Sequence, residues 1–448
     1  MVKMEQRGKP AAAVVSGGFE EDAAITGRVL GLPDLQYITV PDVLTGLPDE
    51  LICSQVEDAL EEANEILTSP PGAPRVRIGE GLTGREPAAP ETFSGEDVMV
   101  AWEAMNNEWL SRGWADGFPL IAPTPEKVAA ALRGTSLAPD HVVGILPPGR
   151  GIATVEKIAI NCVMAGCEPA HLPVMIAAVK AVIAVAGPGY DMSTSADAPL
   201  LIVNGPIVKE LGINSERAAL GPGVQSRVNI VLGRAMRLIK MNIGFNRPGV
   251  MDMDTIGAPT KFSMCIGENE EKSPWDPWHV EHGFDEDKST VAVLNIRNQK
   301  ELADMFNTTP EGVLDTFAFG LSVTPEHYGY YGRHQCSYLL MISPEHASIL
   351  ERYGWDKESV RRYVWHRSEI PAARHTNQIE LMHKDVQGKH WQWYLNMPQE
   401  QKERLMLPVV ETPDRYKIVV VGGVTGKSLS YSFMGAYSTT EITDRVAV

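Results

Sequence analysis

The sequence predicts an α/β protein. Short runs of β-branched and aliphatic residues alternate with longer segments of helical periodicity, and turns rich in Gly and Pro separate them. Hydrophobic residues make up 44% of the 448 residues, which is enough for more than one buried core. We expect a small N-terminal βαβα unit at residues 1–68, a linker at residues 69–95 and a larger multi-layer α/β body at residues 96–448.

The N-terminal unit begins with an apolar run at residues 11–16 that ends before two glycines. A helical pattern follows at residues 19–30, then a second apolar run at residues 37–40 and a helix from about residue 54 to residue 67. This order favours parallel pairing of the two strands through a right-handed crossover. Because two strands alone do not make a stable sheet, we expect the unit to dock onto another part of the protein.

The linker at residues 69–95 is dominated by Pro and Gly and has no apolar periodicity. Ser94 is the expected N-cap of a helix that reaches Arg112, and Thr124 and Ser343 are the expected caps of two later helices. We find no internal sequence repeat. The other helices expected in the body cover residues 124–132, 169–185, 225–243, 309–321 and 344–353, and the expected strands cover residues 141–146, 200–203, 261–266, 290–296, 337–342 and 418–421.

Charge and cysteine content limit the class of protein. Forty basic and 57 acidic side chains give a formal net charge of −17, which disfavours nucleic acid as a partner. Five cysteines do not form a disulfide framework, so we expect reduced thiols. Neither an export signal nor an apolar stretch of membrane-spanning length is visible, and we therefore expect a cytoplasmic protein without a membrane partner.

The GGVTGKS segment at residues 422–428 has the composition of a phosphate-binding loop. A P-loop needs four residues between its first Gly and the Gly-Lys pair, and here that first position is Val421. We therefore expect a β-turn or hairpin near the C-terminus instead.

Two glycine-containing turns are candidates for binding an anion. Arg150 lies in PPGRGIAT, residues 147–154, which we expect to lead directly into a helix whose N-terminal N–H groups attract negative charge. Asn204 lies in an Asn-Gly-Pro turn after an expected strand, at the sheet edge where α/β proteins build their sites. An ordinary loop with a solvated arginine is the alternative for the first turn.

Cys162 and Cys167 lie five positions apart around Gly166, which is a natural residue to end a helix. Cys167 would then precede the next helix, whose dipole stabilises a thiolate, and this makes it the best candidate for a nucleophile or redox thiol. The alternative is that both cysteines are small apolar core residues. The C-x4-C spacing is neither a redox C-x-x-C motif nor a zinc site.

Acids and imidazoles concentrate after the strand expected at residues 261–266. We expect Glu268, Glu270 and His279 to act as an acid/base set. The alternative for the same three residues is that they hold a divalent metal, and a solvated acidic loop is the third. His334 lies in a Gly- and aromatic-rich loop at residues 327–336 that could cover the same site and contact the substrate.

The segment GKPAAAVVSGGFEEDAAITGRVLGLPDLQYITVP resembles the latter part of the UGSC-type domain, which is named for a selenocysteine-Gly-Ser-Cys motif and related to selenoprotein B of glycine-type reductases. The stretches AINCVMAGCEPAHLPV, ENEEKSPWDPWHVEHGF and ISPEHASILERYGW resemble large uncharacterised proteins that carry or accompany that domain. The resemblance implies reductive selenol or thiol chemistry. The chain contains no Cys-Gly-Ser-Cys, so this chemistry is not carried over.

Together these patterns favour an enzyme for a small anionic or carbonyl-containing substrate, with one composite pocket. Cys167 would be its nucleophile or redox thiol, Glu268, Glu270 and His279 would transfer protons, and Arg150, Asn204 and His334 would bind substrate. Two alternatives remain: a metal-dependent lyase, hydratase or hydrolase, and a non-catalytic subunit of a reductase-like complex. We expect either a homo-oligomer or a partner subunit.

Overall fold

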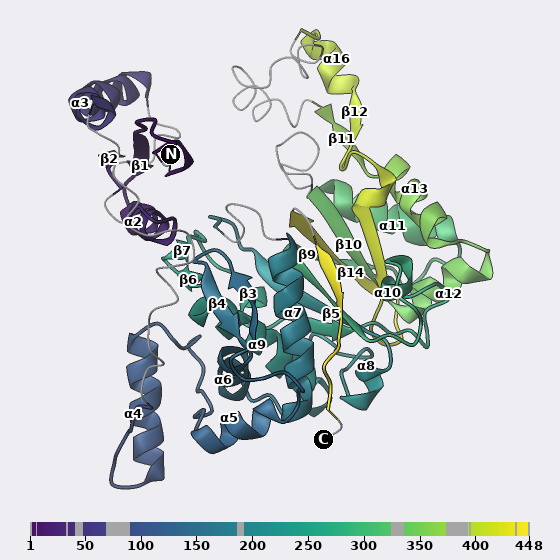
Figure 1. Ribbon diagram of the computed structural model, residues 1–448. Coiled ribbons are helices and arrows are strands. Elements are labelled where there is room, and N and C mark those ends of the chain that lie inside the picture. Colours follow the sequence, from purple (N-terminus) through teal and green to yellow (C-terminus); the bar gives the residue numbers. More distant parts are fainter. Residues whose placement is uncertain are drawn as a thin grey trace.

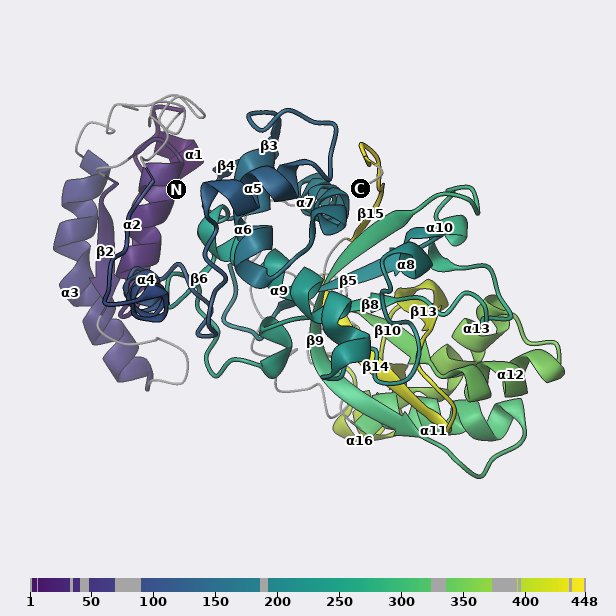
Figure 2. The same cartoon turned by 90° about the horizontal axis from the view of Figure 1, so that it is seen from below.

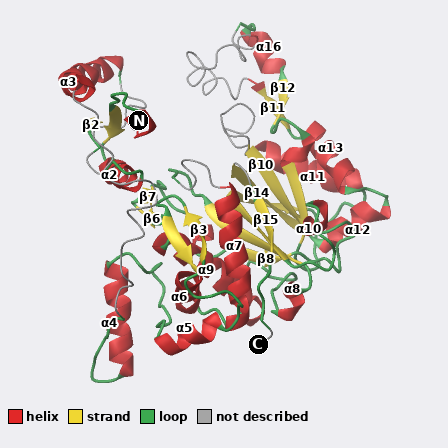
Figure 3. Cartoon of the chain, in the orientation of Figure 1, coloured by secondary structure: helices red, strands yellow, loops and turns green. Residues whose placement is uncertain are grey.

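A computed structural model shows an α/β protein in which helices cover a curved, mixed β-sheet (Figures 1 and 3). The predicted fold class is therefore confirmed. No helix among the described residues is long and apolar enough to span a bilayer. The structure describes residues 2–5, 7–32, 35–40, 48–68, 90–185, 192–323, 336–372, 393, 396–434 and 437–446.

The N-terminal unit contains two strands that pair in parallel, with Ala13 opposite Tyr37. This agrees with the predicted βαβα order. The unit touches the body where the carboxylate of Asp22 accepts a hydrogen bond from the Met251 backbone N–H. Its elements are α1 (Val2–Glu5), β1 (Ala13–Ser16), α2 (Glu20–Val29), β2 (Tyr37–Val40) and α3 (Asp49–Thr68).

Local capping chemistry explains where several helices of the body begin. Thr124, Thr154 and Ser343 each accept a backbone N–H through the side-chain oxygen. Ser94 is not a cap, because the Asp97 carboxylate accepts the N–H groups of Met99 and Val100 instead. The helices are α4 (Val98–Ser111), α5 (Pro125–Leu132), α6 (Val155–Ala165), α7 (Leu172–Val185), α8 (Ile207–Glu210), α9 (Arg227–Asn242), α10 (Trp278–Glu281), α11 (Pro310–Val323), α12 (Pro344–Arg352), α13 (Lys357–Arg367) and α16 (Gln399–Arg404), with 3₁₀ turns η1 (Pro169–His171), η2 (Val224–Ser226), η3 (Pro259–Lys261) and η5 (Pro413–Arg415).

The main sheet has the strand order β13-β10-β14-β9-β5-β8, and β15 extends the pairing along β9. Its two halves have the same topology although their sequences do not repeat. In each half a central strand, β5 or β10, pairs in parallel with an outer strand and antiparallel with an inner one. The strands are β5 (Ala198–Asn204), β8 (Cys265–Gly267), β9 (Thr290–Ala303), β10 (Cys336–Ile342), β13 (Tyr416–Val420), β14 (Lys427–Met434) and β15 (Ser438–Glu441); the smaller two-stranded sheets contain β3 (Val142–Leu146), β4 (Gly151–Thr154), β6 (Arg247–Pro248), β7 (Met251–Asp252), β11 (Glu369–Pro371) and β12 (Met406–Pro408).

The sheet is curved, so its inner face forms a core of its own that includes side chains from all six strands. The two outer strands approach each other where the Asn269 N–H donates to the Val420 carbonyl oxygen at 2.8 Å. On the outer face, α7 and α9 pack on β9 and β5 with α6 packed against these two helices, whereas α11, α12 and α13 share a core with β10 and β13 (Figure 2). Each half of the sheet therefore has its own helical layer.

Three local predictions need correction. The turn at residues 147–150 does not lead directly into a helix, because strand β4 lies between it and α6. The strand predicted at residues 261–266 is the short β8, preceded by the 3₁₀ turn η3. Residues 421–426 form a turn, but the strands on either side of it both pair with β10, which lies between them, so they are not a hairpin.

Candidate functional site

Four polar side chains meet where β5 and β8 end, and we call Asn204, Glu268, Glu270 and His279 the carboxylate centre. Asn204 is the last residue of β5, the two glutamates follow β8, and His279 belongs to α10. The strands are parallel neighbours, so their carboxyl ends lie at the same sheet edge. The structure thus brings together four of the residues that the sequence singled out.

One amide links the two carboxylates. Asn204 Nδ2 donates to Glu268 Oε2 at 2.6 Å and to Glu270 Oε1 at 3.0 Å. Backbone N–H groups complete the arrangement, because Trp278 donates to Glu268 Oε2 at 2.7 Å and Gly205 donates to Glu270 Oε1 at 2.8 Å. The pair is therefore fixed through one oxygen of each carboxylate.

His279 completes the centre from the other side. Its side chain is fully buried, and Nδ1 lies 3.7 Å from Glu270 Oε1. The other ring nitrogen, Nε2, lies 3.4 Å from the backbone oxygen of Glu286. Glu270 itself is 29% exposed and is the member of the centre that solvent reaches.

Several buried polar atoms at this centre have no hydrogen-bond partner among the described residues: Asn204 Oδ1, Glu268 Oε1, His279 Nδ1 and Thr290 Oγ1. Thr290 is the first residue of β9, and no local pattern predicts it as a site residue. A buried polar group without a partner costs about 1–3 kcal/mol. A cluster of them in one place is what a site that receives a polar ligand requires.

Burial raises the pKa of Glu268 to about 7, and the negative charge of Glu270 adds to this rise. The Lys357 ammonium and the N–H donors of Trp278 and Asn204 oppose it, but they do not outweigh the loss of hydration. Glu268 thus holds or releases a proton near neutral pH.

The geometry does not support the metal alternative for Glu268, Glu270 and His279. Within the described part of the chain, no group of three or more His, Cys, Asp or Glu side chains is arranged to hold a metal ion.

A second polar centre surrounds Cys167, and we call Cys162, Cys167 and His171 the thiol centre. As predicted, Gly166 ends α6 in the left-handed conformation, with φ 97°. Cys167 follows in the turn before η1, and its N–H donates to the Cys162 carbonyl oxygen at 2.9 Å. All five cysteines are free thiols, and Cys167 is only partly buried.

Hydrogen bonding lowers the pKa of Cys167 to about 6, first through Cys162 and then through His171, against the opposite effect of burial. The positive charge of Arg234 helps, and the pKa of Cys162 rises well above its ordinary value in return. His171 Nδ1 accepts the Glu168 N–H at 3.0 Å, so the neutral ring carries its proton on Nε2 and can donate it to the sulfur. Only the thiol form can donate to the Val231 oxygen, 3.5 Å from Sγ.

The two centres do not form the composite pocket that the sequence predicts. Cys167 packs with the helices on the outer face of the sheet, whereas Trp278, which contacts Glu268, belongs to the inner-face core. No described contact joins Cys167 to Glu268 or to the rest of the carboxylate centre. A sequence pattern does not tell on which face of a curved sheet a distant residue packs.

The other two predicted substrate contacts fall elsewhere. Arg150 lies in the turn between β3 and β4, with φ 59°, and four residues of strand separate it from the N-terminus of α6. The prediction that Arg150 lies at the N-terminus of that helix is therefore wrong, and its contact with a substrate stays a prediction. His334 lies outside the described residues. His171 was missed, although the Cys-x3-His spacing that places it one helical turn after Cys167 is visible in the sequence.

Comparison with known proteins identifies one segment of this α/β chain. Residues 1–69 match the UGSC family, so the predicted UGSC-type resemblance is confirmed for the N-terminal unit. The searches of curated proteins and of solved structures found no match.

Proposed function

We propose that the protein is an enzyme that transfers protons to and from a small carbonyl-containing or anionic substrate at the carboxylate centre. The observation that carries this proposal is a pair of carboxylates on one amide, surrounded by buried polar atoms without partners. Two neighbouring carboxyl groups in unequal environments can act as acid and base in the same site. We further propose a cytoplasmic enzyme that works as a homo-oligomer or with a partner subunit.

In this proposal each residue has a definite role. The Glu270 carboxylate takes a proton from the carbon next to the substrate carbonyl, and the electron pair of that C–H bond moves towards the carbonyl oxygen. Glu268 donates its own proton to that oxygen, which gives the enol, and the reverse steps return both protons. Asn204 Oδ1 and Thr290 Oγ1 would orient the substrate's polar groups.

Hydrogen exchange in D₂O tests this proposal without knowledge of the product. The full chain is incubated with a panel of 2-oxo acids and small ketones, and loss of the α-proton signal is followed by NMR. Glu268→Gln and Glu270→Gln should slow the exchange by about a hundredfold or more. Glu358→Gln, at an exposed position of α13, is the control. Exchange that persists in both carboxamide variants would exclude these roles.

The thiol centre supports a second candidate function, in which Cys167 is a nucleophile or redox thiol. The specific observation is that Cys162 and His171 both donate towards the sulfur of the partly buried Cys167. If Cys167→Ser abolishes exchange or turnover of a substrate while Glu270→Gln does not, the thiol centre is the active site and the first proposal fails.

A further inference from the structure

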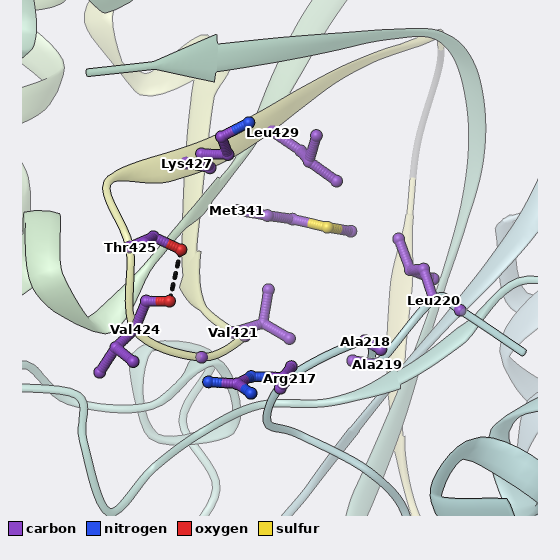
Figure 4. A pocket seen from close by; sticks show the side chains of 13 residues that line it. Arg217, Ala218, Ala219, Leu220, Met341, Val421, Val424, Thr425, Lys427 and Leu429 are labelled. Carbon is purple, nitrogen blue, oxygen red and sulfur yellow. Dashed lines mark hydrogen bonds between the residues drawn. The ribbon is translucent and has the colours of Figure 1, made fainter. Parts of the chain in front are cut away.

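A pocket of about 500 Å³ lies at the turn between β13 and β14 (Figure 4). Met341, Val421 and Leu429 contribute apolar side chains from the main sheet and its end. The loop at residues 217–221 forms the facing wall, and Arg217 and Lys427 bring the cationic groups. The turn is the GGVTGKS segment, whose composition, but not its spacing, is that of a phosphate-binding loop.

The turn is held in place by bonds at both of its ends. The Gly422 N–H donates to the Ser215 oxygen at 2.9 Å, and the Thr425 N–H donates to Glu345 Oε2 at 2.9 Å. Further along, Ser428 Oγ lies 2.7 Å from Nδ1 of the buried His346. The backbone N–H groups of residues 423 and 424 donate to none of the described residues, so they remain available to a ligand.

Among the charges around the pocket, Arg217 and Glu345 have no ion pair with a described residue, and the Glu345 carboxylate instead accepts the Thr425 N–H. Lys427 pairs with Glu301 at 3.3 Å, and Glu216 pairs with Lys272 at 3.2 Å. Arg217 forms no ion pair with any described residue, although it lines the pocket. Arg217 lies close to the turn at position 423. The glycine there makes room for it, because a Cβ at this position would lie 3.1 Å from the Cβ of Arg217.

We propose that this pocket binds a small molecule with an oxyanion, a carboxylate or phosphate, on an apolar group of a few carbons. Arg217 and the free N–H groups of Gly423 and Val424 bind the oxyanion. Met341, Val421 and the neighbouring apolar side chains bind the hydrocarbon part. None of the residues of the carboxylate centre lines the described pocket, although Asn269, between Glu268 and Glu270, donates a hydrogen bond to the oxygen of the pocket residue Gly422.

Methyl NMR of the full chain tests this proposal directly at the site. The protein is labelled with methyl-¹³C methionine, and the Met341 signal, assigned with Met341→Leu, reports on the pocket. Hexanoate and hexyl phosphate are the anionic probes, and hexanamide is the neutral probe of similar shape. At least one anion should shift the Met341 signal saturably, and Arg217→Gln should weaken its binding about tenfold.

The control is Arg362→Gln, which removes an exposed arginine of α13 and should bind the anion like the wild-type protein. Hexanamide should bind more weakly than the anions, and equally in the wild-type and Arg217→Gln proteins. The proposal is overturned if neither anion moves the Met341 signal, if hexanamide binds as well as they do, or if Arg217→Gln leaves anion binding unchanged. A response to only one of the anions tells which oxyanion the site accepts.

Discussion

The carboxylate centre and the thiol centre both remove an ionisable group from water, but the outcome is opposite. In the carboxylate centre the effect of burial prevails: it raises the pKa of Glu268 to about 7, so the carboxyl group stays protonated below that pH. In the thiol centre hydrogen bonds prevail: they lower the pKa of Cys167 to about 6, so the thiolate form predominates above that pH. Burial alone therefore does not determine which form of a group a protein stabilises.

The difference lies in what surrounds each charge. The donors to Glu268 reach only one of its oxygens, Oε1 has no described partner, and Glu270 places a second negative charge nearby. Cys167 instead receives two side-chain donors and lies in the positive field of Arg234. The carboxylate centre thus keeps a carboxylate oxygen without a described partner, whereas the donors of the thiol centre converge on its sulfur.

The largest expected effect is on the pH dependence of stability at Glu268. Its pKa in the folded protein, about 7, lies above the ordinary value of 4.5. The stability that this group contributes is therefore fully present below pH 4.5 and is lost as the pH rises through 7, which amounts to about 3 kcal/mol. The Glu268→Gln side chain imitates the protonated carboxyl group, so this variant should keep that stability at high pH.

Urea unfolding at pH 4.5 and pH 8 measures this difference. The free energy of unfolding of Glu268→Gln should equal that of the wild-type protein at the lower pH and exceed it by about 3 kcal/mol at the higher pH. The exposed Glu358→Gln variant should follow the wild-type protein at both values. Parallel pH profiles for Glu268→Gln and the wild type would show that Glu268 is ionised at no cost.

The second prediction concerns the thiol centre, where removing one hydrogen-bond donor should let the effect of burial raise the pKa of Cys167. Cys162→Ala deletes the hydrogen bond that contributes most to lowering the pKa of Cys167. The pH at which alkylation of Cys167 is half-maximal, about 6 in the wild-type protein, should rise. Mass spectrometry at each pH reports it, with the exposed Cys53 as reference. The midpoint is the proper readout, because a thiolate of low pKa is also a weaker nucleophile.

A matched control separates hydrogen bonding from packing at this centre. Cys265 is a buried cysteine of the same core that makes no hydrogen bond to Cys167. Cys265→Ala should leave the alkylation midpoint near 6. Equal shifts in the two variants would mean that altered packing, and not the Cys162 donor, controls the thiol.

Capping and turn chemistry could be predicted from the sequence because it is local. Thr124 begins a helix and Gly166 ends one as expected, and the strand at residues 37–40 is where the pattern places it. In contrast, β14 was missed although Leu429, Tyr431 and Phe433 alternate with serines, which is the period-2 pattern of a strand. That the serines are buried as well follows only from its position between β10 and β9, which no local pattern reveals.

The same limit applies to the candidate sites. The i, i+2 spacing of Glu268 and Glu270 after a strand, and Asn204 after another, led correctly to one sheet edge. Thr290 carries no local signal, because it reaches the centre only through the pairing of β9 with β5. Cys167 was wrongly joined to the acids because α6 and α7 pack on the outer face of the sheet, which no spacing reveals.

The smallest expected effect tests whether the Thr290 hydroxyl lacks a partner. Thr290 Oγ1 is buried without a described partner, so Thr290→Val should raise the free energy of unfolding by about 1 kcal/mol, because it removes an unsatisfied polar group. Thr316→Val is the matched control, because Thr316 Oγ1 donates to Asp304 Oδ2 at 2.9 Å and its loss should cost about 1–2 kcal/mol. Urea unfolding of both variants gives the comparison. If Thr290→Val costs as much as Thr316→Val, the Thr290 hydroxyl is already satisfied within the protein, and the argument that this centre awaits a polar ligand loses one of its four atoms.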